Sequence, residues 1–216
     1  MNRSQNLAQT AHQRIIAMMF EGTLAPGDAL REATLGEDLG MSRTPVREAI
    51  KRILSEGLAV HDGRMIRVRR LRLPEIEEVF FLRLALEPTL ARSAVRLAPQ
   101  RLDEIEERIR RLMTAGPEER DGHWQIDNEF HELLTEAAGN QTALNVLQGL
   151  RQRTCVFDHK ILPERYLEGC AEHLDILEAV RSGQPERVEA EMTRHLENAR
   201  DAVLARLRRL PDRTAP

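Results

Sequence analysis

The chain has 216 residues and a formal net charge of −3, a length that allows one large or two small domains. It has no run near the roughly 20 apolar residues that cross a bilayer, and its N-terminus lacks the apolar core of a secretion signal. Cys155 and Cys170 are not spaced as a CxxC pair, so a reducing cytoplasm is the expected location. Aromatic residues make up only 3% of the chain, which argues against recognition of RNA or single strands by base stacking.

Charge is distributed unevenly along the sequence. Residues 1–72 hold 12 basic and 8 acidic side chains, whereas residues 73–216 hold 20 basic and 27 acidic ones. A basic N-terminal part followed by an acidic remainder indicates that one end of the molecule meets nucleic acid.

The N-terminal part predicts helix, short helix, glycine turn and helix, in that order. An amphipathic first helix ends near Gly22, and a turn at residues 26–28 follows it. The second helix covers residues 31–39, and Gly40 ends it. The third helix begins after Ser42, which is a favourable N-cap residue because its hydroxyl can accept from the free amides of the first turn.

This third helix has the features of a DNA-recognition helix. Arg43, Arg47 and Lys51 are four residues apart, so they lie on one side of the helix, and Thr44 lies beside them. A helix N-terminus that carries a hydroxyl and two arginines on one face suits the DNA major groove. A solvated basic face on an ordinary helix is the alternative interpretation, which the order of the surrounding elements weakens.

A short hairpin is predicted after the third helix. Residues 58–61 form the first strand, Asp62 and Gly63 make the turn, and residues 65–69 form the return strand. Together with the preceding helices this predicts a winged helix-turn-helix. Arg64 at the tip of the wing is placed to reach a minor groove or a phosphate.

An ordered series of residues makes this part of the chain resemble the N-terminal domain of GntR-family transcriptional regulators: Leu30-Arg31-Glu32, Leu35, Leu39-Gly40-Met41-Ser42-Arg43-Thr44-Pro45-Val46-Arg47-Glu48-Ala49-Ile50, Leu54 and Glu56-Gly57-Leu58. The resemblance implies that Arg43, Thr44 and Arg47 contact operator DNA and that Gly63 lies at the tip of the wing.

Two positions depart from the pattern of that family. Ala33 stands where FadR-like members carry a DNA-contacting arginine, which makes Arg31 the candidate substitute. Gly36 lies inside the second helix, where glycine costs about 1 kcal/mol relative to alanine, and close packing is the only account that the sequence offers.

The remainder of the chain predicts an all-α, six-helix antiparallel bundle, because helical periodicity continues without any strand pattern. Pro74 suits the first turn of a new helix, so the predicted domains are residues 1–72 and 73–210, with 211–216 as a frayed tail. Pro88 is expected to kink the first of these helices. The six predicted helices cover residues 74–97, 99–114, 117–138, 142–156, 166–182 and 185–210.

Four polar residues of the bundle form a candidate metal site. Asp127 and His131 are one helical turn apart, while His173 and His195 lie on the last two helices, and each is close to apolar residues. One carboxylate and three imidazoles are a suitable ligand set for a divalent transition metal. Isolated histidines are more often surface residues or hydrogen-bonded core residues, and the spacing alone leaves both interpretations open.

Five further segments resemble the FCD domain, the ligand-binding domain of FadR-type regulators: Arg83-Leu84-Ala85-Leu86-Glu87, Asp127-Asn128-Glu129-Phe130-His131, Ala137-Ala138-Gly139-Asn140, and the two histidine motifs Glu172-His173-Leu174-Asp175-Ile176-Leu177-Glu178-Ala179 and Met192-Thr193-Arg194-His195-Leu196. The resemblance implies that Asp127, His131, His173 and His195 hold zinc, nickel or manganese, and that Arg83 faces an effector pocket. Six helices place the chain near the VanR-like group.

These inferences predict a cytoplasmic transcriptional regulator that binds double-stranded operator DNA as a homodimer and responds to a small organic acid. Arg83 has an alternative role, an ion pair with Glu87 one turn away. Two other functions compete: a metal-dependent, hydrolase-like enzyme that activates water, and a repressor that senses the metal itself.

Overall fold

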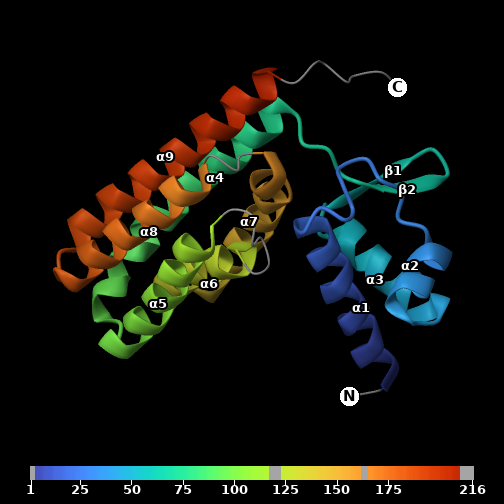
Figure 1. Cartoon of the computed structure of the whole chain (residues 1–216), viewed down its shortest axis with the longest axis horizontal. Coiled ribbons are helices and arrows are strands. Elements are labelled where there is room, and N and C mark those ends of the chain that lie inside the picture. Colours follow the sequence, from blue (N-terminus) through green and yellow to red (C-terminus); the bar gives the residue numbers. More distant parts are fainter. Residues whose placement is uncertain (1–2, 117–122, 162–164, 210–216) are drawn as a thin grey trace. The chain divides into compact units, whose positions relative to one another are not determined.

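The structure, a computed structural model, describes residues 3–116, 123–161 and 165–209 (Figure 1). The chain divides into two compact units, Met1–Leu71 and Arg72–Pro216. The predicted tail at residues 211–216 lies outside the described residues, as does the start of the helix predicted from residue 117.

The first unit is a winged helix-turn-helix, which confirms the predicted fold. Its elements are α1 (Arg3–Phe20), α2 (Glu32–Leu39), α3 (Arg43–Ser55), β1 (Ala59–Asp62) and β2 (Met65–Val68). Helix α1 packs against α3. Apolar side chains of both helices are almost completely buried, among them Ile15, Met19, Val46 and Ile53. Removing this apolar surface from water stabilises the unit and fixes the opposite, polar face of α3 toward solvent.

The connection between α2 and α3 explains the glycine inside α2. Gly40 ends α2 in the left-handed conformation with φ at 64°, and the amide of Met41 donates to the carbonyl of Gly36 over 2.8 Å. A Cβ atom at Gly36 would lie 2.9 Å from the carbonyl oxygen of Met41. Glycine is therefore required at position 36 because the chain passes directly over it after the turn.

The wing is a two-stranded antiparallel hairpin in which Asp62 pairs with Met65. The two loop residues are therefore Gly63 and Arg64, one position later than the predicted turn. Gly63 has φ at 58°, a conformation that suits the first position of a tight hairpin turn. Beside β2, the amide of Leu30 donates to the carbonyl of Ile66 over 2.8 Å, so the segment before α2 pairs with the edge of the small sheet.

The second unit is a bundle that contains six α-helices within the described residues, as predicted. Its elements are α4 (Leu73–Ala91), the 3₁₀ turn η1 (Arg92–Arg96), α5 (Pro99–Ala115), α6 (His123–Glu136), α7 (Gln141–Ile161), α8 (Arg165–Arg181) and α9 (Pro185–Arg209). Helix α4 packs against α6, α7 and α9, and α8 packs against α5 and α9. The long helices α4 and α9 lie side by side in Figure 1.

The first helix predicted in the bundle, over residues 74–97, is divided in the structure into α4 and η1. Pro88 lies inside α4, where it supplies no amide hydrogen to the preceding turn. The α-helix continues past it to Ala91, and the chain then tightens into η1. Both α4 and η1 contact α6 and α9.

Apolar faces of α5, α6, α8 and α9 form the main core of the bundle. Ile109, Phe130, Ile176, Leu177 and Met192 are all completely buried in it. Polar residues that interrupt these faces are therefore enclosed by the core, which is how the bundle places the histidines discussed below. No helix among the described residues is both long and apolar enough to cross a membrane.

Candidate functional site

The exposed face of α3 is the first candidate site. Ser42 occupies the N-cap position with an extended backbone, but its hydroxyl makes no hydrogen bond to the first turn, so the predicted side-chain cap is wrong in this detail. The apolar residues of α3 are buried against the rest of the unit, and the polar face is left to solvent. The residues predicted to contact DNA are all exposed: Arg31, Ser42, Arg43, Thr44, Arg47, Lys51, Gly63 and Arg64.

Two of these cations have acidic partners that the sequence analysis missed. The guanidinium of Arg47 donates to both oxygens of Glu32 on α2, over 2.8 and 2.9 Å. Lys51 donates to Glu48 over 2.9 Å. The hydrogen bond from Arg47 lowers the pKa of the Glu32 carboxyl, and the same contact raises the pKa of Arg47. Because both pairs are exposed to water and salt, they can exchange for phosphate or base contacts at small cost.

The second candidate site is a buried histidine cluster in the bundle. His131 from α6, His173 from α8 and His195 from α9 each offer a ring nitrogen, and these nitrogens lie within 4.8 Å of one another. Asp127, one turn before His131, places Oδ1 at 3.5 Å from Nε2 of His173 and 4.0 Å from Nε2 of His131. The structure thus brings all four predicted ligands together. The Asp127 side chain remains 22% exposed, whereas the three imidazoles are buried.

Two carboxylates orient two of these imidazoles from behind. Nδ1 of His131 lies 2.7 Å from Oε2 of Glu87, and Nδ1 of His195 lies 2.8 Å from Oε2 of Glu172. Since a carboxylate only accepts hydrogen bonds, the bond to Glu172 favours the His195 tautomer that carries its proton on Nδ1 and leaves a lone pair on Nε2. The contact of His131 with Glu87 favours the same tautomer through charge, although its angles are not those of a hydrogen bond. Carboxylates commonly hold metal-binding histidines in this way. Sequence reasoning found the histidines but not these partners, because they come from other helices or from a neighbouring motif residue.

The cluster is suited to a cation. Nε2 of His131 is buried and has no hydrogen-bond partner among the described residues, which is costly unless something else satisfies it. Phe130 stacks on the ring of His173 with centroids 4.1 Å apart and excludes water from that side. A divalent transition metal would satisfy the ring nitrogens, and the partly exposed Asp127 would leave a route from solvent.

The protonation states agree with a ligand role. Burial lowers the pKa of His195, although its hydrogen bond to Glu172 opposes this, so the neutral imidazole is favoured. Burial alone would raise the pKa of Glu172, but hydrogen bonds from His195, Arg165 and Asn198 bring it far below its usual range. Burial raises the pKa of the nearby Cys170 thiol to about 11, so this residue stays protonated and is a poor ligand.

Glu87 links the cluster to a set of buried arginines. Burial alone would raise its pKa, but Arg83, His131 and Arg151 together hold it well below the usual range. Arg83 donates from Nε to Oε1 of Glu87 over 2.7 Å and from Nη1 to Oγ1 of Thr154 over 3.1 Å. The ion pair that the sequence offered as the alternative for Arg83 is therefore present, and its predicted contact with an effector remains a prediction.

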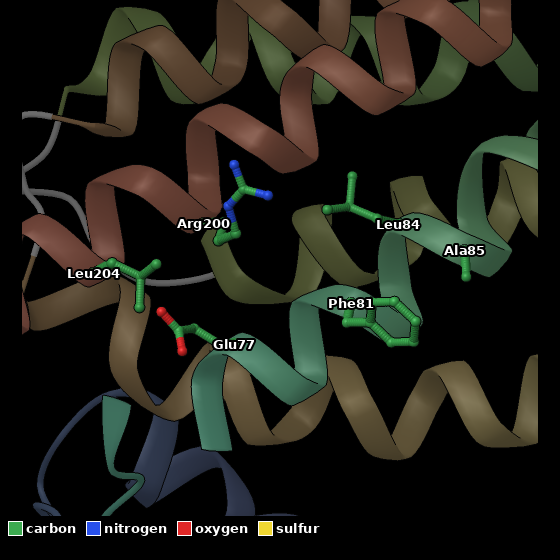
Figure 2. Close-up of a pocket in the computed structure, with 6 residues that line it drawn as sticks. All are labelled: Glu77, Phe81, Leu84, Ala85, Arg200 and Leu204. Atoms are coloured by element: carbon green, nitrogen blue, oxygen red, sulfur yellow. The ribbon is translucent and has the colours of Figure 1, made fainter. Parts of the chain in front are cut away.

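A third feature is an apolar hollow on the outer surface of α4 and α9 (Figure 2). Phe81 is 72% exposed, and Leu82 beside it is 42% exposed. The residues that line the hollow are Glu77, Phe81, Leu84 and Ala85 from α4, and Arg200 and Leu204 from α9. Exposed aromatic and aliphatic side chains that gather in this way are typical of a protein contact surface.

A winged helix-turn-helix joined to a helical bundle with a buried histidine cluster defines a class of DNA-binding transcriptional regulators. Comparison with known proteins agrees with this assignment. The model of the FCD domain matches residues 78–198, and the model of bacterial regulatory proteins of the gntR family matches residues 7–68. The chain belongs to the GntR family and carries an FCD domain as its C-terminal part.

Relatives and solved structures are consistent with this membership. The chain is 28% identical over 211 residues to the HTH-type transcriptional repressor RspR of Escherichia coli K12, covering 94% of this chain and 91% of that protein. It is 30% identical over 188 residues to an HTH-type transcriptional regulator of E. coli O6:H1, covering 83% and 81%.

Among solved structures, the E. coli protein McbR/YncC aligns with a TM-score of 0.79 at 24% identity, covering 92% of this chain and 97% of that chain. The family and the curated relatives are transcriptional regulators and not enzymes, which sets aside the hydrolase-like alternative.

Proposed function

We propose that residues 1–72 bind double-stranded operator DNA and that residues 73–210 form a metal-containing domain that senses a small organic acid. The observation that carries this proposal is the convergence of His131, His173 and His195, from three helices, on one buried point beside Asp127. A core without a ligand would favour apolar residues at these positions, because three buried imidazoles need partners.

The metal would be held by Asp127, His131, His173 and His195, with Glu87 and Glu172 fixing two of the rings. Zinc, nickel and manganese all accept such nitrogen and oxygen ligands. When bound, the ion supplies a Lewis-acidic position that a carboxylate oxygen of the effector can occupy. The partly exposed side chain of Asp127 supports access to this position from solvent.

Regulation would follow from linkage between the two domains. An acid that binds two arrangements of the protein with different affinities shifts their populations and so changes operator affinity. Coupling of about 1–3 kcal/mol corresponds to a change of about five- to 150-fold in DNA affinity. A repressor that senses only the metal is the second candidate, since a buried cluster of this kind could respond to metal supply directly.

The test separates these two mechanisms. Protein purified without chelators is subjected to elemental analysis, and its preferred DNA is selected from a random library. Operator affinity is then measured for the metal-free protein, for the metal-loaded protein, and for the metal-loaded protein with a panel of small acids. A change only on addition of an acid supports acid sensing, whereas a change on loading alone supports metal sensing. Absence of metal in protein that still binds DNA would overturn the metal-containing domain.

We further propose that the regulator acts in the cytoplasm as a homodimer that uses the hollow on α4 and α9. Two-fold operators match two-fold proteins, and the exposed Phe81, with Leu84 and Leu204 also lining the hollow, gives this face the apolar character of an interface. Phe81→Asp should yield monomers in light-scattering measurements. Val146→Asp is the control, because Val146 is also an exposed apolar residue, at 47%, but lies on α7. If both variants have the same oligomeric state, the dimer interface does not lie at this hollow.

A further inference from the structure

Arg151 on α7 is a buried cation, and two of its three donor nitrogens have no acceptor among the described residues. Only 1% of the residue is exposed, and it is among the largest completely buried side chains of the chain. Its Nε and Nη1 atoms have no hydrogen-bond acceptor among the described residues. A guanidinium keeps its charge at all physiological pH values, so it cannot avoid this cost by losing a proton.

Glu87, the nearest described carboxylate, does not fill these donors. Its Oε1 accepts from Nε of Arg83 over 2.7 Å, and its Oε2 lies 2.7 Å from Nδ1 of His131. The distance from that Oε2 to Nη1 of Arg151 is 4.0 Å, which is too long for a hydrogen bond. Glu87 therefore balances the charge of Arg151 from a distance: its Oε1 accepts from Arg83, and its Oε2 makes a short ion-pair contact with His131 that lacks hydrogen-bond geometry.

The same contacts place Arg151 next to the histidine cluster. Oε2 of Glu87 lies near both Nδ1 of His131 and Nη1 of Arg151, so one carboxylate oxygen separates the metal-site histidine from the buried guanidinium. A ligand that touches both the cluster and Arg151 must therefore be small. Arg83, in contrast, already donates to Glu87 and Thr154.

We propose that Arg151 is the anion-binding residue of the bundle and receives a carboxylate, or an equivalent oxyanion, of a small acid. This inference rests on the proposed function, since it assigns the residue that recognises the effector beside the metal. Anionic oxygens are the strongest acceptors for a guanidinium, and burial strengthens such charge-assisted hydrogen bonds. Arg83 would then act as a positioning residue that keeps Glu87 in place, while Arg151 contacts the ligand.

Formate, the smallest carboxylate, tests this assignment without requiring the shape of the natural effector. The full chain, labelled with ¹⁵N-arginine and freed of metal by a chelator, is titrated with formate while the arginine Nε–H resonances are followed. One resonance, assigned to Arg151 by its absence in Arg151→Lys, should move saturably. Formate affinity should fall by about tenfold in Arg151→Lys, which keeps the charge but loses the planar donors, and by more in Arg151→Gln.

Arg110→Gln is the matched control, because Arg110 is exposed on α5 and pairs with Glu106 on the same helix. It should bind formate as the original protein does. The proposal is overturned if the Arg151 resonance does not move in the original protein, or if Arg151→Lys, checked for folding by circular dichroism, binds formate unchanged.

The metal-free condition separates this result from the proposed function. If the metal-free original protein does not bind formate at Arg151, but protein purified without chelators contains metal by elemental analysis, only the role of Arg151 is refuted. Formate binding at Arg151 in a chain that never takes up metal would refute only the metal site.

Discussion

The two units carry their functional polar residues in opposite environments. On α3, Arg47 and Lys51 are exposed, and their pairs with Glu32 and Glu48 are exposed as well. In the bundle, Glu87 has no exposed surface, and the rings and guanidinium groups around it are buried. The first unit can therefore exchange its partners freely, whereas the second must satisfy each polar group internally or with a ligand.

The largest expected effect comes from removing the carboxylate at the centre of the buried network. Glu87→Leu leaves Arg83 and Arg151 without a counter-charge and His131 without its carboxylate partner. We expect the free energy of unfolding of the bundle to fall by about 3–5 kcal/mol, as measured by denaturant titration. Glu32→Leu removes a carboxylate from an exposed pair and should cause no measurable loss. If the two variants are equally stable, the buried carboxylate is no more important to folding than the exposed one.

Removal of the metal should produce the next largest effect. A ligand that binds only the folded state at 100 times its dissociation constant stabilises the protein by about 2.7 kcal/mol. A chelator should therefore lower the melting temperature of the original protein. His173→Ala should contain no metal and should not respond to the chelator, while keeping nearly all its helix content by circular dichroism. If His173→Ala retains one metal ion per chain, the assignment of the ligands is wrong.

The sequence predicted the fold because the fold depends on local signals, and it predicted the four candidate metal ligands because their motifs resemble those of a known family. Helix spacing, glycine turns and motif residues are read along the chain, and Asp127 and His131 share one turn of one helix. The hydrogen-bond partners of the ligands were not predictable in this way. Glu87 reaches His131 from α4 only after the bundle has formed, and the sequence offered Glu87 only as a partner of Arg83.

Arg151 shows a further limit of sequence reasoning. It lies on a helix rich in polar residues, where an arginine is expected to face solvent, and only the packing of the bundle buries it. Gly36 gives the reverse case, since its departure from helix preference was visible in the sequence. Its cause, the carbonyl of Met41 lying over it, required the three-dimensional structure.

Loss of a recognition residue should have a smaller effect that leaves stability intact. We expect Arg43→Ala to weaken binding to the selected DNA by about five- to 150-fold, because a base contact is lost. Lys51→Ala should instead weaken binding to all sequences similarly and reduce the salt slope by about one unit. Fluorescence anisotropy on specific and scrambled duplexes at several salt concentrations distinguishes the two. If Arg43→Ala and Lys51→Ala behave alike, α3 provides charge but does not read bases.

The smallest expected effect tests whether the exposed pairs restrain DNA binding. Glu32 occupies the guanidinium of Arg47 with two hydrogen bonds, so Arg47 must release Glu32 before it can contact DNA. Glu32→Gln weakens this competition and should raise operator affinity by a few-fold.

The control is Glu37→Gln, which removes the same charge from an exposed position on α2. Both variants reduce repulsion from DNA phosphates, so only the excess gain in Glu32→Gln reports the release of Arg47. That excess should disappear when Arg47→Ala is added, because Glu32 then has no guanidinium to withhold from DNA. A gain that persists in the double variant would show that Glu32 acts through charge alone and that Arg47 is as available to DNA as its exposure suggests.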